Sequence, residues 1–110
     1  MAPRSEFTLR TGVVDGRLAY VGVGGAIDGQ VNPDLVVQSG DIVRIDLVNG
    51  DGASHDLAVD RLGARTPLGM ARDKAVSMTF KAGKSGVFPY LCTVAGHRQA
   101  GMEGRLVINP

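Results

Sequence analysis

The sequence is poor in the residue types that most often carry chemistry. It has no tryptophan, one cysteine and two histidines among 110 residues. A single cysteine excludes an internal disulfide and leaves one thiol to be explained. No apolar run approaches the roughly 18 residues of a membrane span, and residues 1–11 lack the apolar middle of a signal peptide. We therefore expect no membrane insertion, and a soluble mature protein or a domain of a longer one.

The charges are nearly balanced. Twelve basic and eleven acidic residues give a net charge of +1 and a pI near 7.9, and they form no block of one sign. Nothing therefore points to nucleic acid or a membrane surface as a partner.

The length fits one domain spanning residues 1–110, and 44% hydrophobic residues are enough for one core. Sixteen glycines, with valine and isoleucine runs separated by turn residues, predict an all-β protein. About eight strands at this spacing are typical of a Greek-key β-sandwich. The expected strands are residues 6–14, 18–23, 35–38, 42–48, 54–59, 75–80, 87–92 and 104–108.

The connections between these strands carry their own signals. Asp15-Gly16 is a strong two-residue hairpin signal, and the glycine cluster at residues 22–25 reads as a flexible turn or bulge. Residues 42–48 alternate with a period of two, as in a half-buried strand. Residues 60–73 show no steady period, so we expect them to cross from one sheet to the other, with room for a short helical turn.

The metal-binding residue types gather in one short stretch. Cys92, His97 and Met102 are spaced Cys-x4-His-x4-Met, and the other histidine, His55, follows a β-like run 37 positions before the cysteine. Sulphur donors favour copper or zinc over magnesium or calcium. Two histidines, a cysteine and a distant methionine make the trigonal set with a weak axial thioether that describes a blue-copper site.

Each residue also has a simpler interpretation when taken alone. His55 could be a hydrogen-bonded structural histidine, Cys92 a small buried hydrophobe and Met102 a gap-filler in the core. Their coincidence at one spacing favours the metal site. The alternative axial ligands are Met1, Met70 and Met78, and zinc is the rival metal, although structural zinc sites rarely use methionine.

This stretch resembles the ligand loop of the cupredoxins. Its spacing is most similar to the mononuclear copper loop of multicopper oxidases, and Gly-Met-Glu-Gly-Arg-Leu-Val-Ile at residues 101–108 resembles the copper nitrite reductases, as do residues 27–49. The resemblance implies one type 1 copper, with His55, Cys92 and His97 in a plane and Met102 on the axis. It also implies a periplasmic or otherwise extracytoplasmic protein.

One departure from the family is informative. In multicopper oxidases the residues that flank the cysteine are histidines that bind a separate copper cluster, and here they are Leu91 and Thr93. That cluster cannot be built from this chain.

The resemblance also suggests roles for neighbouring residues. The residue after the first histidine should tie its strand to the residue after the cysteine, so we expect Asp56 to accept a hydrogen bond from Thr93; an exposed Asp56 is the simpler alternative. His97 should reach the surface through an apolar patch that exchanges electrons with a partner. The candidate patch residues are Ala95, Ala100, Gly101, Leu68 and Pro67.

Three functions follow as hypotheses. The first is a blue-copper electron carrier, free or as the extra cupredoxin domain of a multidomain copper nitrite reductase, whose partner is a redox protein or a neighbouring redox domain. The second is a nitrite reductase or oxidase, but its catalytic copper needs further histidines and must lie in other domains, so the chain by itself is not expected to be an enzyme. The third is copper delivery or storage, which usually places ligands on exposed flexible segments.

Overall fold

The computed structural model describes residues 4–110, about half of which lie in nine β-strands. Their bounds are β1 Arg4–Val14, β2 Arg17–Val23, β3 Leu35–Gln38, β4 Ile42–Val48, β5 Ala58–Val59, β6 Ala64–Arg65, β7 Ala75–Lys81, β8 Gly86–Leu91 and β9 Glu103–Asn109. Two 3-10 turns, η1 at Gly25–Ile27 and η2 at Asp60–Leu62, complete the regular structure. None of the helical segments in this part of the chain has the length and apolar character needed to cross a membrane.

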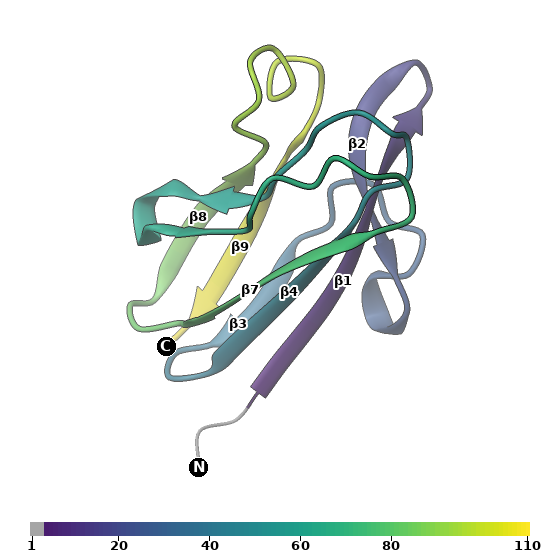
Figure 1. Ribbon diagram of the computed structural model, residues 1–110. Helices are drawn as coiled ribbons and strands as arrows, with labels where there is room; N and C mark the ends of the chain where they lie inside the picture. The colour runs from purple at the N-terminus through teal and green to yellow at the C-terminus, as the bar shows by residue number, and fades with distance from the viewer. Residues whose placement is uncertain (1–3) are drawn as a thin grey trace.

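The strands form two packed sheets (Figure 1). One sheet has the order β2-β1-β4-β7 and the other β3-β9-β8-β5-β6. The pairs β1–β4 and β3–β9 are parallel, and the other pairs are antiparallel. This is the all-β sandwich that the sequence predicts, with one more strand than expected.

The alternation within β4 shows how the sequence builds the core. Val43, Ile45 and Leu47 are buried between the sheets, whereas Arg44 and Asp46 lie on the outer face and form an ion pair at 3.0 Å. Side chains of successive strand residues point to opposite faces, so a shift of this segment by one residue would expose its apolar side chains. The period-two prediction for residues 42–48 is confirmed.

The β1–β2 hairpin is also as predicted. Asp15 and Gly16 both have positive φ, 50° and 77°, as the central residues of a type I′ turn require. The glycine cluster at residues 22–25 contains the end of β2 and leads into η1.

The segment around His55 differs from the prediction. Residues 54–59 were expected to form one strand, but only Ala58 and Val59 do so, and His55 forms an isolated bridge with Gly69. The side chains of residues 55–59 are all buried, so both faces of this segment are covered and the alternation of a half-buried strand is absent. The N–H of Leu57 is bonded to the Thr66 hydroxyl instead of a neighbouring strand.

The irregular segment after residue 59 contains the extra strand. The expected helical turn is η2, and Gly63, in the left-handed conformation, reverses the chain into β6, which pairs with β5. The rest of the segment then crosses to β7 in the other sheet, as predicted. Strand β6 has two residues, too few to show a period in the sequence.

Candidate metal centre

The structure brings three of the predicted ligands together. The donor atoms of His55, Cys92 and His97 all lie within 4.8 Å of one another. The Cys92 sulphur is 4.0 Å from Nδ1 of His55 and 3.5 Å from Nδ1 of His97. Donors on a single ion, with bonds of about 2.0 Å to nitrogen and 2.3 Å to sulphur, lie up to roughly 4.3 Å apart, so these residues fit around one metal with little movement.

The backbone fixes Cys92 and Met102 relative to each other. Cys92 directly follows β8, and its N–H donates to the Met102 carbonyl at 3.3 Å, while the Met102 N–H donates to the His97 carbonyl at 3.1 Å. Cys92 and Met102 are both buried in the core cluster. The loop that joins β8 to β9 projects from the end of the sandwich opposite to the C-terminus (Figure 1).

The other methionines considered as axial ligands are less suited to that role. Met78 is buried in the core on β7, and Met70 is 64% exposed. Met1 lies outside the described residues. Met102 therefore remains the predicted axial ligand, because it lies in the same loop as two other ligands.

Asp56, the residue after His55, is hydrogen bonded to Thr93, the residue after Cys92, as predicted. Its carboxylate accepts hydrogen bonds from the Thr93 backbone N–H at 2.7 Å and from the Thr93 hydroxyl. Asp56 is 1% exposed, so the alternative of an exposed aspartate is wrong. Its carbonyl also accepts a hydrogen bond from the buried Tyr20 hydroxyl, and Arg65 lies 3.6 Å from its carboxylate. The segment that carries His55 is thus tied directly to the residue after Cys92.

A carboxylate that the sequence analysis missed contacts the first histidine. Both carboxylate oxygens of Asp51 lie 2.8 Å from Nε2 of His55, on the side of the ring opposite to Cys92. The Asp-x3-His spacing is visible in the sequence, but a separation of four residues outside a helix does not show that the two side chains meet.

Two asparagines that the sequence analysis also missed shape the surroundings. Asn49 is buried, and its side-chain oxygen accepts hydrogen bonds from the N–H groups of Asp51 and Gly52. Asn32 accepts from the Tyr20 N–H at 2.9 Å and donates to the Gly101 carbonyl at 2.8 Å. Such side-chain to backbone bonds are the usual reason for asparagine in turns, although nothing in the sequence shows which backbone groups they reach.

Burial favours the neutral forms of Cys92 and His97. Burial raises the pKa of the Cys92 thiol, so the thiol keeps its proton unless a cation is near. Burial, and then the neighbouring His55, lower the pKa of His97, so its imidazole stays neutral and can bind a metal through its lone pair. A bound metal ion would supply the positive charge that favours the thiolate form of Cys92.

The residues of the predicted exchange surface all have solvent-accessible side chains or backbone, as does His97. His97 is half-buried; Pro67, Leu68 and Ala95 are exposed, and Ala100 and Gly101 are half-buried. Leu68 is adjacent to Gly69, which pairs with His55, so the loop at residues 66–70 lies beside the centre. Met70, in the same loop, adds an exposed apolar side chain that the sequence analysis did not include.

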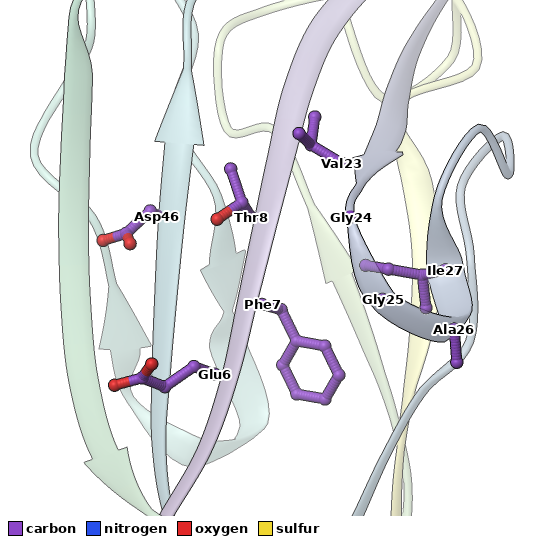
Figure 2. Close-up of a pocket in the computed structure, with 9 residues that line it drawn as sticks. All are labelled: Glu6, Phe7, Thr8, Val23, Gly24, Gly25, Ala26, Ile27 and Asp46. Atoms are coloured by element: carbon purple, nitrogen blue, oxygen red, sulfur yellow. The ribbon is translucent and has the colours of Figure 1, made fainter.

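A separate hollow of about 340 Å³ lies beside β1, where β2 gives way to η1 (Figure 2). Phe7 and Ile27 lie on one side of β1, and Glu6 and Asp46 lie on the other. The Asp46 carboxylate already accepts hydrogen bonds from the side chains of Arg44 and Ser77. The hollow contains none of the predicted ligands.

Comparisons with known proteins agree with this description. The copper-containing nitrite reductase of Alcaligenes xylosoxydans xylosoxydans is 36% identical over 88 residues, which are 71% of this chain and 27% of that protein. Auracyanin A, a blue copper protein of Chloroflexus aurantiacus, superposes with a TM-score of 0.69 at 19% identity, over 96% of this chain and 99% of its own. The copper nitrite reductase of Thermus scotoductus gives 0.68 at 25% identity, over 100% of this chain and 28% of its own. No family model matches the chain.

The chain is a cupredoxin domain. The domain spans about a quarter of the length of the nitrite reductases that it matches in sequence. The structures that resemble this cupredoxin include both small blue copper proteins and parts of larger copper enzymes. The donor set of two imidazoles, one thiol and a nearby thioether residue suits copper better than zinc.

Proposed function

We propose that this cupredoxin domain is a type 1 blue-copper electron-transfer unit in which His55, Cys92, His97 and Met102 would hold the copper. The observation that carries the proposal is the meeting of two imidazole nitrogens and one sulphur within 4.8 Å. Copper, when bound, supplies a one-electron couple between Cu(II) and Cu(I).

The protein contributes rigidity and exclusion of water. His55 and Cys92 are at most 1% exposed, and Met102 is fully buried. His55 is fixed through its backbone bridge to Gly69 and Cys92 through its position at the end of β8. Ligands held on such a framework move little between the two oxidation states, which keeps the rearrangement that accompanies electron transfer small. This placement favours electron transfer over copper delivery.

The half-buried His97 is the proposed route for electrons. Apolar or small residues of the two loops beside the centre support this role, because exposed apolar surface often marks a contact with a partner; they are Pro67, Leu68, Ala95, Ala100 and Gly101. The partner we propose is a redox protein or a neighbouring redox domain of a larger copper oxidoreductase.

The domain acts in this proposal as an electron carrier and not by itself as an enzyme. Both histidines of the chain belong to the electron-transfer site, so a catalytic copper would need ligands from other domains. The matches to nitrite reductases over part of their length support a place in a larger protein of that kind. The single-domain organisation of residues 1–110 and the extracytoplasmic location remain predictions.

Titration of the protein with Cu(II), followed by visible absorption, tests the proposal. We expect an intense thiolate-to-copper band that ascorbate bleaches reversibly. Cys92→Ser should abolish the band, and Met102→Leu should shift it, because the axial sulphur is lost. The matched control is Met70→Leu, an exposed methionine whose replacement should leave the band unchanged. Copper binding without the band in the unaltered protein would contradict the proposal.

A further inference from the structure

The strongest unassigned feature is the carboxylate of Asp51 against the far side of the His55 ring. Both of its oxygens lie 2.8 Å from Nε2, while Nδ1 of the same ring points to the Cys92 sulphur. The Asp51 side chain is 14% exposed and that of His55 1% exposed, so water screens this contact poorly.

The contact determines which ring nitrogen carries the proton. An ionised carboxylate only accepts hydrogen bonds, so a neutral His55 beside it must carry its proton on Nε2. Its lone pair then lies on Nδ1, on the side where the sulphur of Cys92 and Nδ1 of His97 are placed. The ring is therefore oriented and in the correct tautomer for a metal at that point.

The backbone around Asp51 holds the carboxylate in place. The Ala53 N–H donates to its Oδ1 at 3.0 Å, and the Asn49 side chain accepts from the Asp51 N–H at 3.2 Å. Arg72 donates to the Asp51 carbonyl at 3.0 Å. The turn that carries Asp51 is thus held by several hydrogen bonds, and the contact of its carboxylate with His55 does not depend on a freely moving side chain.

Only one of the two histidines has a carboxylate partner among the described residues. Within residues 4–110, no carboxylate is hydrogen bonded to His97, whose ring contacts the Cys92 sulphur. A carboxylate that accepts a hydrogen bond from an imidazole N–H makes the other ring nitrogen more basic, and so a stronger metal ligand. It also places a negative charge near the metal. Both effects favour the more highly charged oxidation state of the metal.

We propose that Asp51 is a positioning residue that fixes the orientation and tautomer of His55 and biases the centre toward Cu(II). The second part of this inference rests on the proposed copper function, and the first part does not. Asp51 therefore lowers the reduction potential of the domain relative to a cupredoxin whose first histidine lacks a carboxylate partner.

Two substitutions separate orientation from charge. Asp51→Asn keeps an oxygen that can accept from Nε2 but removes the charge, and Asp51→Ala removes both. Asp73→Asn is the matched control, because Asp73 is an exposed aspartate that pairs with Arg10. All three variants change the net charge by the same amount.

The first measurement uses the metal-free protein, by NMR of the ring nitrogens of His55. The unaltered protein, Asp51→Asn and Asp73→Asn should show a protonated Nε2 with a slowly exchanging proton, and Asp51→Ala should lose that protection. A protected Nε2 proton that persists in Asp51→Ala would overturn the positioning role, whatever the outcome of copper binding.

The second measurement compares the dissociation constants of Cu(II) and Cu(I). Asp51→Asn should lower the preference for Cu(II) on the order of tenfold, as outer-sphere partners of metal ligands typically do. A tenfold change corresponds to a rise of about 59 mV in the one-electron potential. If the unaltered protein develops the blue band but Asp51→Asn matches Asp73→Asn in this ratio, the electrostatic part of the inference is wrong. A missing band in the unaltered protein would instead count against the proposed function.

Discussion

The centre consists of two unlike halves. The first, residues 49–56, has a buried histidine that is held at two points. Asp51 contacts Nε2 of its ring, and its backbone forms a bridge with Gly69. The second, residues 92–102, is a loop whose histidine is half-buried and whose hydrogen bonds are mostly internal. Asp56 connects the halves through Thr93.

This difference assigns different work to the two histidines. The first half resembles part of the core, because Asn49, His55 and Asp56 are buried and hydrogen bonded, and buried polar networks of this kind specify one arrangement. The second half reaches the surface at His97. A centre that exchanges electrons needs both a fixed geometry and an accessible edge, and here each half supplies one of them.

The largest effect that separates the halves is expected from removing each imidazole in turn. His55→Gly should lose the copper band and should not regain it with added imidazole, because the space it leaves is buried and already lined by Asp51. His97→Gly should regain much of the band when imidazole is added, because its site is open to solvent. Equal rescue of the two variants, measured by visible absorption, would contradict the division into a closed and an open half.

The next effect concerns the attachment of the loop to the first sheet. A Cβ at Gly101 would lie 2.6 Å from the Leu18 carbonyl oxygen, and φ there is +124°. Gly101→Ala should therefore destabilise the protein by about 1–3 kcal/mol from backbone strain alone, and by more from the close contact.

Gly96→Ala is the matched control in the same loop. Gly96 also has a positive φ, but nothing lies within 4 Å of the added Cβ. Denaturant unfolding of the metal-free proteins should show a smaller loss for Gly96→Ala than for Gly101→Ala. Equal losses would indicate that the loop is not anchored at Leu18.

A smaller effect tests the connection between the halves. Asp56→Asn keeps an acceptor for the Thr93 N–H but removes a buried charge near the centre. The reduction potential should rise, by less than the roughly 59 mV expected for Asp51→Asn, because losing a negative charge near the metal disfavours Cu(II). The shift should be smaller than for Asp51→Asn, because Arg65 already offsets part of the Asp56 charge and, within residues 4–110, no hydrogen bond joins Asp56 to a histidine ring. An unchanged potential by electrochemistry would refute this role.

The sequence alone was sufficient to predict the features that depend on local patterns of residues. The alternation in residues 42–48 and the Asp15-Gly16 turn each determine their structure within a few residues, and the Cys-x4-His-x4-Met spacing defines a short loop. The pairing of Asp56 with Thr93 was also predictable, but only through the resemblance to cupredoxins.

What could not be predicted depends on contacts that no local pattern shows. Residues 54–59 form only a two-residue strand, because the Leu57 N–H is hydrogen bonded to the Thr66 hydroxyl and not to a neighbouring strand. Strand β6 pairs with β5 because the left-handed Gly63 reverses the chain between them. Asp51 was missed for a related reason: its role depends on how Asn49 folds the turn. A spacing of four residues outside a helix does not by itself bring two side chains together.

The smallest effect on the centre itself, and the one that tests the open half alone, is expected from Ala100→Glu. The half-buried Ala100 lies in the loop between His97 and Met102, so a carboxylate there adds charge to the proposed exchange surface without touching a ligand. Electron self-exchange between two copies of the copper-loaded protein, measured by NMR line broadening in mixed oxidation states, should slow because like charges meet at the contact. Val36→Glu is the control, since Val36 is exposed on β3, away from the ligand loop. It adds the same charge, and its self-exchange rate should stay closer to that of the unaltered protein. If the two variants slow the exchange equally, net charge and not this surface governs the contact, and the accessible edge of the centre must be sought elsewhere.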